Sequence, residues 1–171
     1  AAIQHERRAC VDVLSKRYND VSGADVRACA EIGSLHGLKF ALSKLAKAGR
    51  PMIEIASSQC RSISLSVKIS VSQDEWVNAT TEDAIWLIMH TLNTSCAVLA
   101  WLYKAMGPKG FPIDLKSSDS LITRPTMYCE YGCFHNKIGN MRLDVLKYLH
   151  EVHGMPITED LASLFAKFEN E

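Results

Sequence analysis

The chain lacks the features that usually mark a membrane protein or a protein that binds free nucleic acid. Its 19 basic and 19 acidic residues cancel, so the formal net charge is zero. Binding to nucleic acid depends chiefly on neutralising phosphates and normally needs a basic excess. No apolar run, Ala84–Met89 among them, approaches the roughly 18 residues of a membrane span. We therefore expect no membrane span, and contact with RNA only as part of a larger particle.

Catalytic sequence motifs are also missing. No nucleophile elbow, phosphate-binding loop or pair of catalytic carboxylates stands out, and the first residues show no secretory signal pattern. The chain has six cysteines. Two of them, Cys29 and Cys96, lie in apolar helical segments, where buried thiols behave as small hydrophobic groups. We expect a protein that is not an enzyme, holds no cofactor, and occupies an intracellular, reducing compartment such as the cytoplasm or an organelle matrix.

The cysteines leave two alternatives open. An even number of cysteines also permits three disulfide bonds, as in a secreted protein. In addition, Cys129, Cys133 and His135 have a spacing within the range of zinc ligands, and His150 and His153 could complete the set. The second alternative is therefore a zinc-stabilised or thiol-dependent enzyme. Because Cys129 and Cys133 also lie one helical turn apart, we favour packed thiols and predict no metal site.

Three stretches of the chain echo one another. Each is an apolar segment with helical spacing that ends in the same signal. The signals are Gly49-Arg50-Pro51, Gly110-Phe111-Pro112 and Gly154-Met155-Pro156. Repeated helical units of this kind stack into binding scaffolds. The units that we predict are 24–50, 82–114 and 124–157. We also predict an amphipathic helix at 5–18 and a capping helix at 158–169.

Between the first two units the pattern changes to strict alternation. Apolar side chains take every second position from Ile63 to Val71, which predicts a strand over 62–72. The segment 52–56 also alternates, so we expect a β-hairpin finger at 51–73. Two strands alone are marginal in water, so the apolar face either folds back over the helices or is covered by another chain. The residues that we assign to partner binding are Ile63, Leu65, Val67, Lys68, Ile69, Val71 and Trp76.

These units resemble ankyrin repeats. The segment from Gly139-Asn140 through 145–151 to Gly154 is similar to the second half of an ankyrin unit, and Cys29–Leu35 is similar to its inter-helix turn. The Gly-x-Pro signals are spaced more widely than the roughly 33 residues of an ankyrin unit. The resemblance implies one mainly α domain over 1–171, an ankyrin-like helical-hairpin solenoid with an inserted β-hairpin finger. It also implies a non-catalytic scaffold, adaptor or structural subunit that binds protein partners in a stable assembly.

Overall fold

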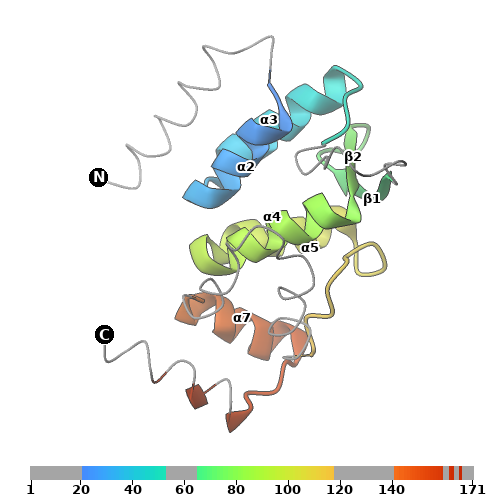
Figure 1. Ribbon diagram of the computed structural model, residues 1–171. Coiled ribbons are helices and arrows are strands. Elements are labelled where there is room, and N and C mark those ends of the chain that lie inside the picture. The colour runs from blue at the N-terminus through green and yellow to red at the C-terminus, as the bar shows by residue number, and fades with distance from the viewer. Residues whose placement is uncertain (1–20, 53–64, 118–140, 160–161, 164–165, 167–171) are drawn as a thin grey trace, which may run out of the picture.

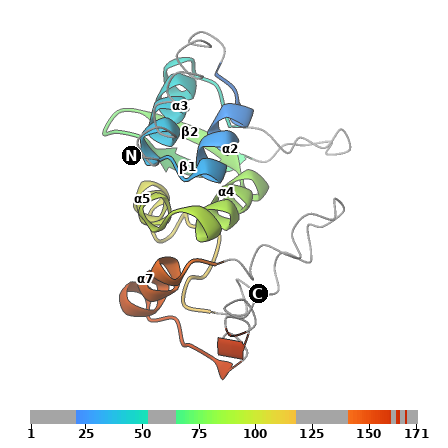
Figure 2. The same cartoon turned by 90° about the vertical axis from the view of Figure 1, so that its left-hand side faces the viewer.

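The computed structural model describes residues 21–52, 65–117, 141–159, 162–163 and 166. Within these ranges it has five helices and one two-stranded sheet. The helices are α2 (Gly23–Ile32), α3 (Leu35–Lys47), α4 (Thr81–Thr94), α5 (Cys96–Met106) and α7 (Leu143–His153), and the strands are β1 (Leu65–Ser70) and β2 (Trp76–Thr80). The α2–α3 pair, the α4–α5 pair and α7 follow one another along the molecule (Figures 1 and 2). The predicted mainly helical class is confirmed, whereas a solenoid is not shown.

Side-chain caps explain why the two helical hairpins turn so tightly. The Ser34 hydroxyl accepts a hydrogen bond from the Gly37 N–H at 3.1 Å and so begins α3. Ser95 closes α4 and also begins α5, where its hydroxyl accepts from the Val98 N–H at 3.3 Å. An accepting side chain at this position satisfies a backbone donor that the helix cannot satisfy itself. Each hairpin therefore reverses direction within one or two residues.

The two hairpins are joined where they turn. The Thr94 hydroxyl donates to the Ala30 carbonyl at 2.9 Å and lies 3.0 Å from the His90 carbonyl of its own helix. Gly33 ends α2 with a φ of 72°, a conformation that favours glycine. A Cβ at Gly33 would lie 3.1 Å from the Thr94 carbonyl oxygen, tighter than an ordinary contact. The turn of the first hairpin is thus fitted closely against the end of α4.

The sheet differs from the predicted finger in its pairing. β1 falls within the predicted strand, but it pairs antiparallel with β2, with Ile69 opposite Val77 and Ser70 opposite Trp76. The sequence pattern did not predict β2, because its alternation lasts only five residues and begins directly after a polar turn. Met52 forms an isolated parallel bridge with Ala79 of β2 and does not pair with β1. Residues 53–64, which include most of the predicted partner strand, lie outside the described residues.

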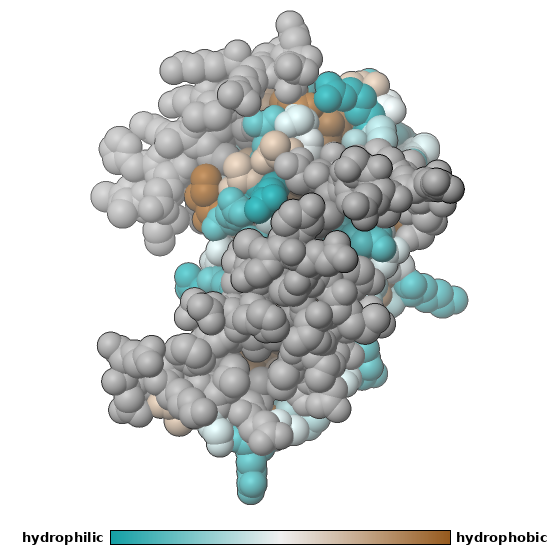
Figure 3. Space-filling view, viewed as in Figure 1, coloured by the Kyte–Doolittle hydropathy of each residue, from teal (hydrophilic) through white to brown (hydrophobic). Residues whose placement is uncertain are grey.

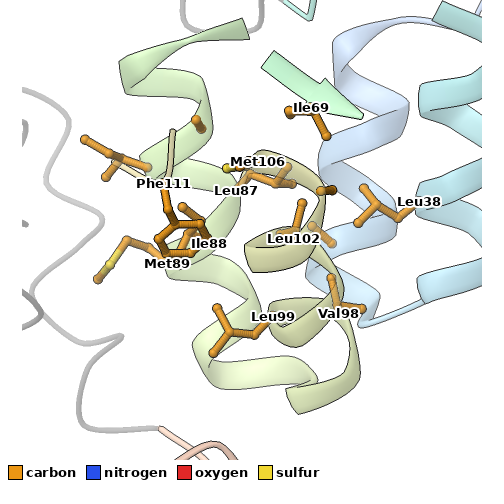
Figure 4. Packing of buried hydrophobic residues seen from close by; sticks show 14 of the residues in the cluster. Leu38, Ile69, Leu87, Ile88, Met89, Val98, Leu99, Leu102, Met106 and Phe111 are labelled. Atoms are coloured by element: carbon orange, nitrogen blue, oxygen red, sulfur yellow. The ribbon is translucent and has the colours of Figure 1, made fainter. Parts of the chain in front are cut away.

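The core lies between the two hairpins and extends under the sheet. Leu38 of α3, Ile69 of β1, Leu87 of α4 and Leu102 of α5 are completely or almost completely buried. Figure 4 shows Ile69 above the side chains of α4 and α5, with Leu38 approaching from the α2–α3 side. The alternating strand thus covers one end of the helical core with its apolar face.

Other predicted elements are only partly described. The helix at 5–18 and the first half of the third unit lie outside the described residues, and the capping helix at 158–169 is described only at isolated positions. The second half of the third unit is α7, close to where the periodicity predicts it. Within the described ranges, no helix combines the length and the apolar character that crossing a membrane requires.

Candidate interaction groove

The two faces of β1 have opposite surroundings. Val67 and Ile69 are 4% and 0% exposed and belong to the domain's own core. The residues that follow each of them, Lys68 and Ser70, are exposed. Of the two alternatives for the apolar face, folding back over the helices is the one that holds for Val67 and Ile69. Their assignment to partner binding is therefore corrected, because side chains that fill the core cannot also reach another protein.

The remaining predicted binding residues fall into three groups. Ile63 lies outside the described residues, and Leu65 is described only as part of the β1 backbone. Val71 is half-buried and packs against the edge of the core. Lys68 and Trp76 are exposed to solvent. Among the assigned residues whose side chains the structure describes, these last two are thus the ones exposed to a partner.

Lys68 and Trp76 contact each other on the solvent face of the sheet. The Lys68 Nζ atom lies 4.1 Å from the centroid of the Trp76 ring. The two residues are diagonal neighbours, since Lys68 lies opposite Asn78 and Trp76 lies opposite Ser70. Long side chains reach one another across such a diagonal, and an exposed cation–π contact contributes roughly 0.5–1 kcal/mol. The pair holds the indole in place and leaves 48% of the Trp76 residue surface exposed.

Trp76 also borders a hollow of about 500 Å³, which we call the Trp76 groove. The groove lies between the end of α3, the loop that follows it, and the β1–β2 turn with the start of β2. Its lining residues are Ala46, Lys47, Gly49, Arg50, Pro51, Asp74, Glu75, Trp76 and Asn78. On its wall, the two Glu75 oxygens are already engaged, because Oε2 accepts from the Ser43 hydroxyl at 2.9 Å and Oε1 lies 3.6 Å from Lys47 Nζ.

Backbone groups of β2 are directed toward the same groove. The Val71 N–H donates to the Glu75 carbonyl at 2.8 Å, while the Asn78 carbonyl accepts from the Met52 N–H at 2.9 Å on the other side of the strand. Because adjacent residues of a strand direct their N–H and C=O groups to opposite edges, Trp76 shares the outer edge with Asn78. The next donor in line toward Trp76, the Arg50 N–H, is bonded to the Leu45 carbonyl at 2.9 Å, so it does not continue the pairing begun by Met52. The outer edge of β2, on which Trp76 and Asn78 lie, therefore borders the groove.

The candidate zinc ligands of the enzyme alternative lie only partly within the described residues. Cys129, Cys133 and His135 lie outside the described residues. His150 is exposed, and its Nδ1 lies 2.8 Å from the Met155 carbonyl, whereas His153 is buried against aromatic rings. Among the described residues, no cluster of three or more histidine, cysteine or acidic side chains could hold a metal ion.

Cys96 is expected from the sequence to be a packing residue. Burial raises the pKa of its thiol, and the negative charge of Asp144 adds to that rise, while Arg142 acts in the opposite direction. A nucleophilic cysteine needs a lowered pKa, so that the thiolate forms near neutral pH. Cys96 therefore has the surroundings of a packing residue, although it stands at the first position of α5.

The groove residues contributed by the loop after α3 were missed by the sequence analysis. Lys47 and Arg50 carry no motif beyond their position at the first Gly-x-Pro signal, and Asn78 of β2 carries no motif at all. The sequence pattern assigns the first Gly-x-Pro signal to the end of a helical unit. The signal lines a groove only because β2 folds beside it. Comparison of the chain with protein-family models, with curated proteins and with solved structures found no match.

Proposed function

We propose that this protein is a non-catalytic interaction module, an ankyrin-like adaptor or structural subunit that binds a partner protein at the Trp76 groove. One observation carries the proposal. Trp76 is 48% exposed at the border of a groove, while the next residue, Val77, is 1% exposed in the core. A large aromatic side chain that is held in place by Lys68 and left half open to water gains free energy when a partner covers it.

The chemistry of the groove supports a protein partner rather than a small substrate. Tryptophan is among the residues that contribute most to binding energy at protein interfaces. Lys68 of β1 and Trp76 of β2 stand on a sheet whose opposite face is packed in the core, so little conformational freedom is lost on binding. The outer edge of β2 also offers main-chain hydrogen bonds to an extended segment of a partner. RNA within the same assembly is compatible with this proposal, which assigns no residue to it.

A matched pair of variants tests the proposal. We would purify the tagged full chain mildly from its source cells, as wild type, Trp76→Ala and Val152→Ala, and measure the native mass and stoichiometry of each preparation. Val152 is a suitable control because it is an equally apolar exposed side chain, 63% exposed, on α7. We expect a stoichiometric complex for the wild type and for Val152→Ala, and at least tenfold less bound partner for Trp76→Ala.

Two results would contradict the proposal. One is a complex that survives Trp76→Ala unchanged while circular dichroism shows that the variant is folded. The other is a wild-type preparation that contains only the bare 19.0 kDa chain. Metal analysis of the same preparation tests the enzyme alternative, since stoichiometric zinc would favour it. The predicted reducing compartment is tested by a count of free thiols under denaturing conditions, which should approach the six cysteines of the sequence.

A further inference from the structure

The contact between α5 and α7 is built around a buried histidine. His153 is 9% exposed, and its ring centroid lies 4.4 Å from that of Tyr103 on α5 and 5.0 Å from that of Tyr148 on α7. The ring planes cross at 71° and 75°. Phe111, in the loop after α5, packs edge-on against Tyr103 with centroids 5.1 Å apart. Four aromatic rings from three segments thus meet where α7 rests on α5.

The polar side of this histidine is incompletely satisfied. Its Nε2 atom is buried and has no hydrogen-bond partner among the described residues. In the neutral ring one nitrogen carries no hydrogen, whereas both nitrogens of a protonated ring are donors. Protonation of the ring would therefore create a buried positive charge. Its Nε2–H would also be a buried donor without an acceptor among the described residues.

The charges that face His153 oppose protonation as well. Burial lowers the pKa of the His153 ring, and the positive charge of Lys116, in the loop after α5, lowers it further. From α7 and α5 the ring meets Tyr148 and Tyr103. Burial raises the pKa of Tyr148, with Cys96 and Tyr103 adding to the rise, so that hydroxyl stays neutral under mildly acidic conditions. On these elements no described carboxylate is found within ion-pair distance of the His153 ring.

We propose that His153 makes the packing of α7 on α5 acid-sensitive, so that protonation of its ring releases α7 from the rest of the domain. The device is separate from the Trp76 groove and goes beyond the proposed function. We expect its effect to be largest at α7, because among the described helices α7 contacts α5, whereas α4 contacts α2, α5 and both strands. A protein of this kind would change the state of its C-terminal part on passing from a neutral to an acidic environment.

The direction of the effect follows from linkage. The folded-state pKa of His153 lies below the ordinary value of 6.5, so the unfolded or released state binds the proton more tightly. The stability that the neutral ring contributes is complete above pH 6.5 and is lost as the pH falls from 6.5 through the lowered pKa. Within that window, the equilibrium constant for release of α7 rises up to about tenfold per pH unit.

Hydrogen exchange of the full chain tests this proposal. Protection factors of the α7 amides, corrected for intrinsic exchange, would be compared with those of α2 and α3 between about pH 7.5 and pH 5. We expect α7 protection in the wild type to fall up to about tenfold per pH unit below 6.5, relative to α2 and α3. His153→Phe keeps an aromatic ring and removes the titration, so α7 protection should become independent of pH. His150→Gln removes the exposed histidine of the same helix and should behave as the wild type.

The outcomes separate cleanly. The proposal is overturned if α7 protection in the wild type does not change with pH. It is also overturned if the pH dependence of α7 protection persists in His153→Phe. If His153→Phe fails to fold, the ring resonances of His153 in the wild type decide the matter by nuclear magnetic resonance. A titration midpoint below 6.5, accompanied by exchange broadening confined to α5 and α7, supports the proposal. A midpoint at or above 6.5 refutes it.

Discussion

Helices α4 and α7 have similar amounts of apolar sequence but very different positions in the molecule. Every residue of α4 from Asp83 to Leu92 is buried, whereas α7 buries only Val145, Leu146, Leu149 and His153. α4 contacts α2, α5 and both strands, while α7 contacts α5. The difference shows how the number of neighbours sets the pattern, since an enclosed helix is apolar all round and a peripheral helix carries a single apolar stripe.

The outer surface fits this contrast. On the face of the molecule drawn in Figure 3, hydrophilic side chains of the described residues lie along the rim, and hydrophobic ones show only in small separate areas. Among the residues that the structure describes, the large exposed hydrophobic ones are Ile32, Trp76, Leu143, Val152 and Ile157. Of these, Trp76 combines exposure with a groove, a fixed strand and a neighbouring cation.

The largest effect is expected for Ile69→Asp, which places a carboxylate in the enclosed region. Ile69 is 0% exposed, and a buried unpaired charge costs several kcal/mol, a large part of the stability of a domain. We expect loss of the helical circular dichroism signal. Ser70→Asp is the matched control, because Ser70 is the next residue of β1 and points to solvent. A folded Ile69→Asp chain would show that the strand is not part of the core.

A pair of leucine substitutions compares the two helices directly. Leu87 of α4 and Leu149 of α7 are both 0% exposed. Each change to alanine should cost about 2–5 kcal/mol of local packing free energy. For Leu87→Ala we expect a lower urea midpoint for the whole domain. For Leu149→Ala we expect hydrogen exchange of α7 to accelerate while α2 and α3 keep their protection. Equal behaviour of the two variants would mean that α7 unfolds together with the core.

The smallest expected effect on stability concerns the residues that precede the first turns of α4 and α7. The Thr80 hydroxyl accepts a hydrogen bond from the Asp83 N–H at 3.0 Å. The same hydroxyl donates to the Asp83 carboxylate at 2.7 Å. Arg142 stands at the same position before α7 without a capping side-chain bond. Thr80→Ala should therefore cost about 1 kcal/mol in chemical denaturation, and Thr80→Ser should restore most of it. Arg142→Ala should change stability by at most about 0.5 kcal/mol, and a larger loss would contradict the assigned caps.

Much of the helical part could be predicted from the sequence, because its signals are local. Hydrophobic periodicity and the closing Gly154 predict a helix in the second half of the unit 124–157, where α7 is observed. The alternation of β1 likewise predicted which side chains point the same way. It could not decide what covers them, because that depends on residues distant in the sequence, on α4 and α5. For the same reason Val67 and Ile69 were assigned to partner binding, although the domain's own helices cover them.

The candidate site was predictable only in its two exposed members. Trp76 drew attention because it follows a strand in polar surroundings, and Lys68 because it lies on the polar side of the alternation. The groove itself arises when β2 pairs with β1 and brings Asn78 beside the loop after α3. No pattern within either segment encodes that approach, since it is a property of tertiary structure.

The close fit of Gly33 against the end of α4 bears on how this chain tolerates changes of length. Along the edge where the hairpins turn, a single added methyl group would meet the Thr94 carbonyl at 3.1 Å. At the opposite edge, a Cβ on Gly49 or Gly107 would meet nothing within 4 Å in the described part of the chain, whereas one on Gly110 would meet the Met106 carbonyl oxygen at 2.5 Å. Insertions, affinity tags or a new pair of termini should therefore be accepted after Gly49 and rejected beside Gly33 and Gly110.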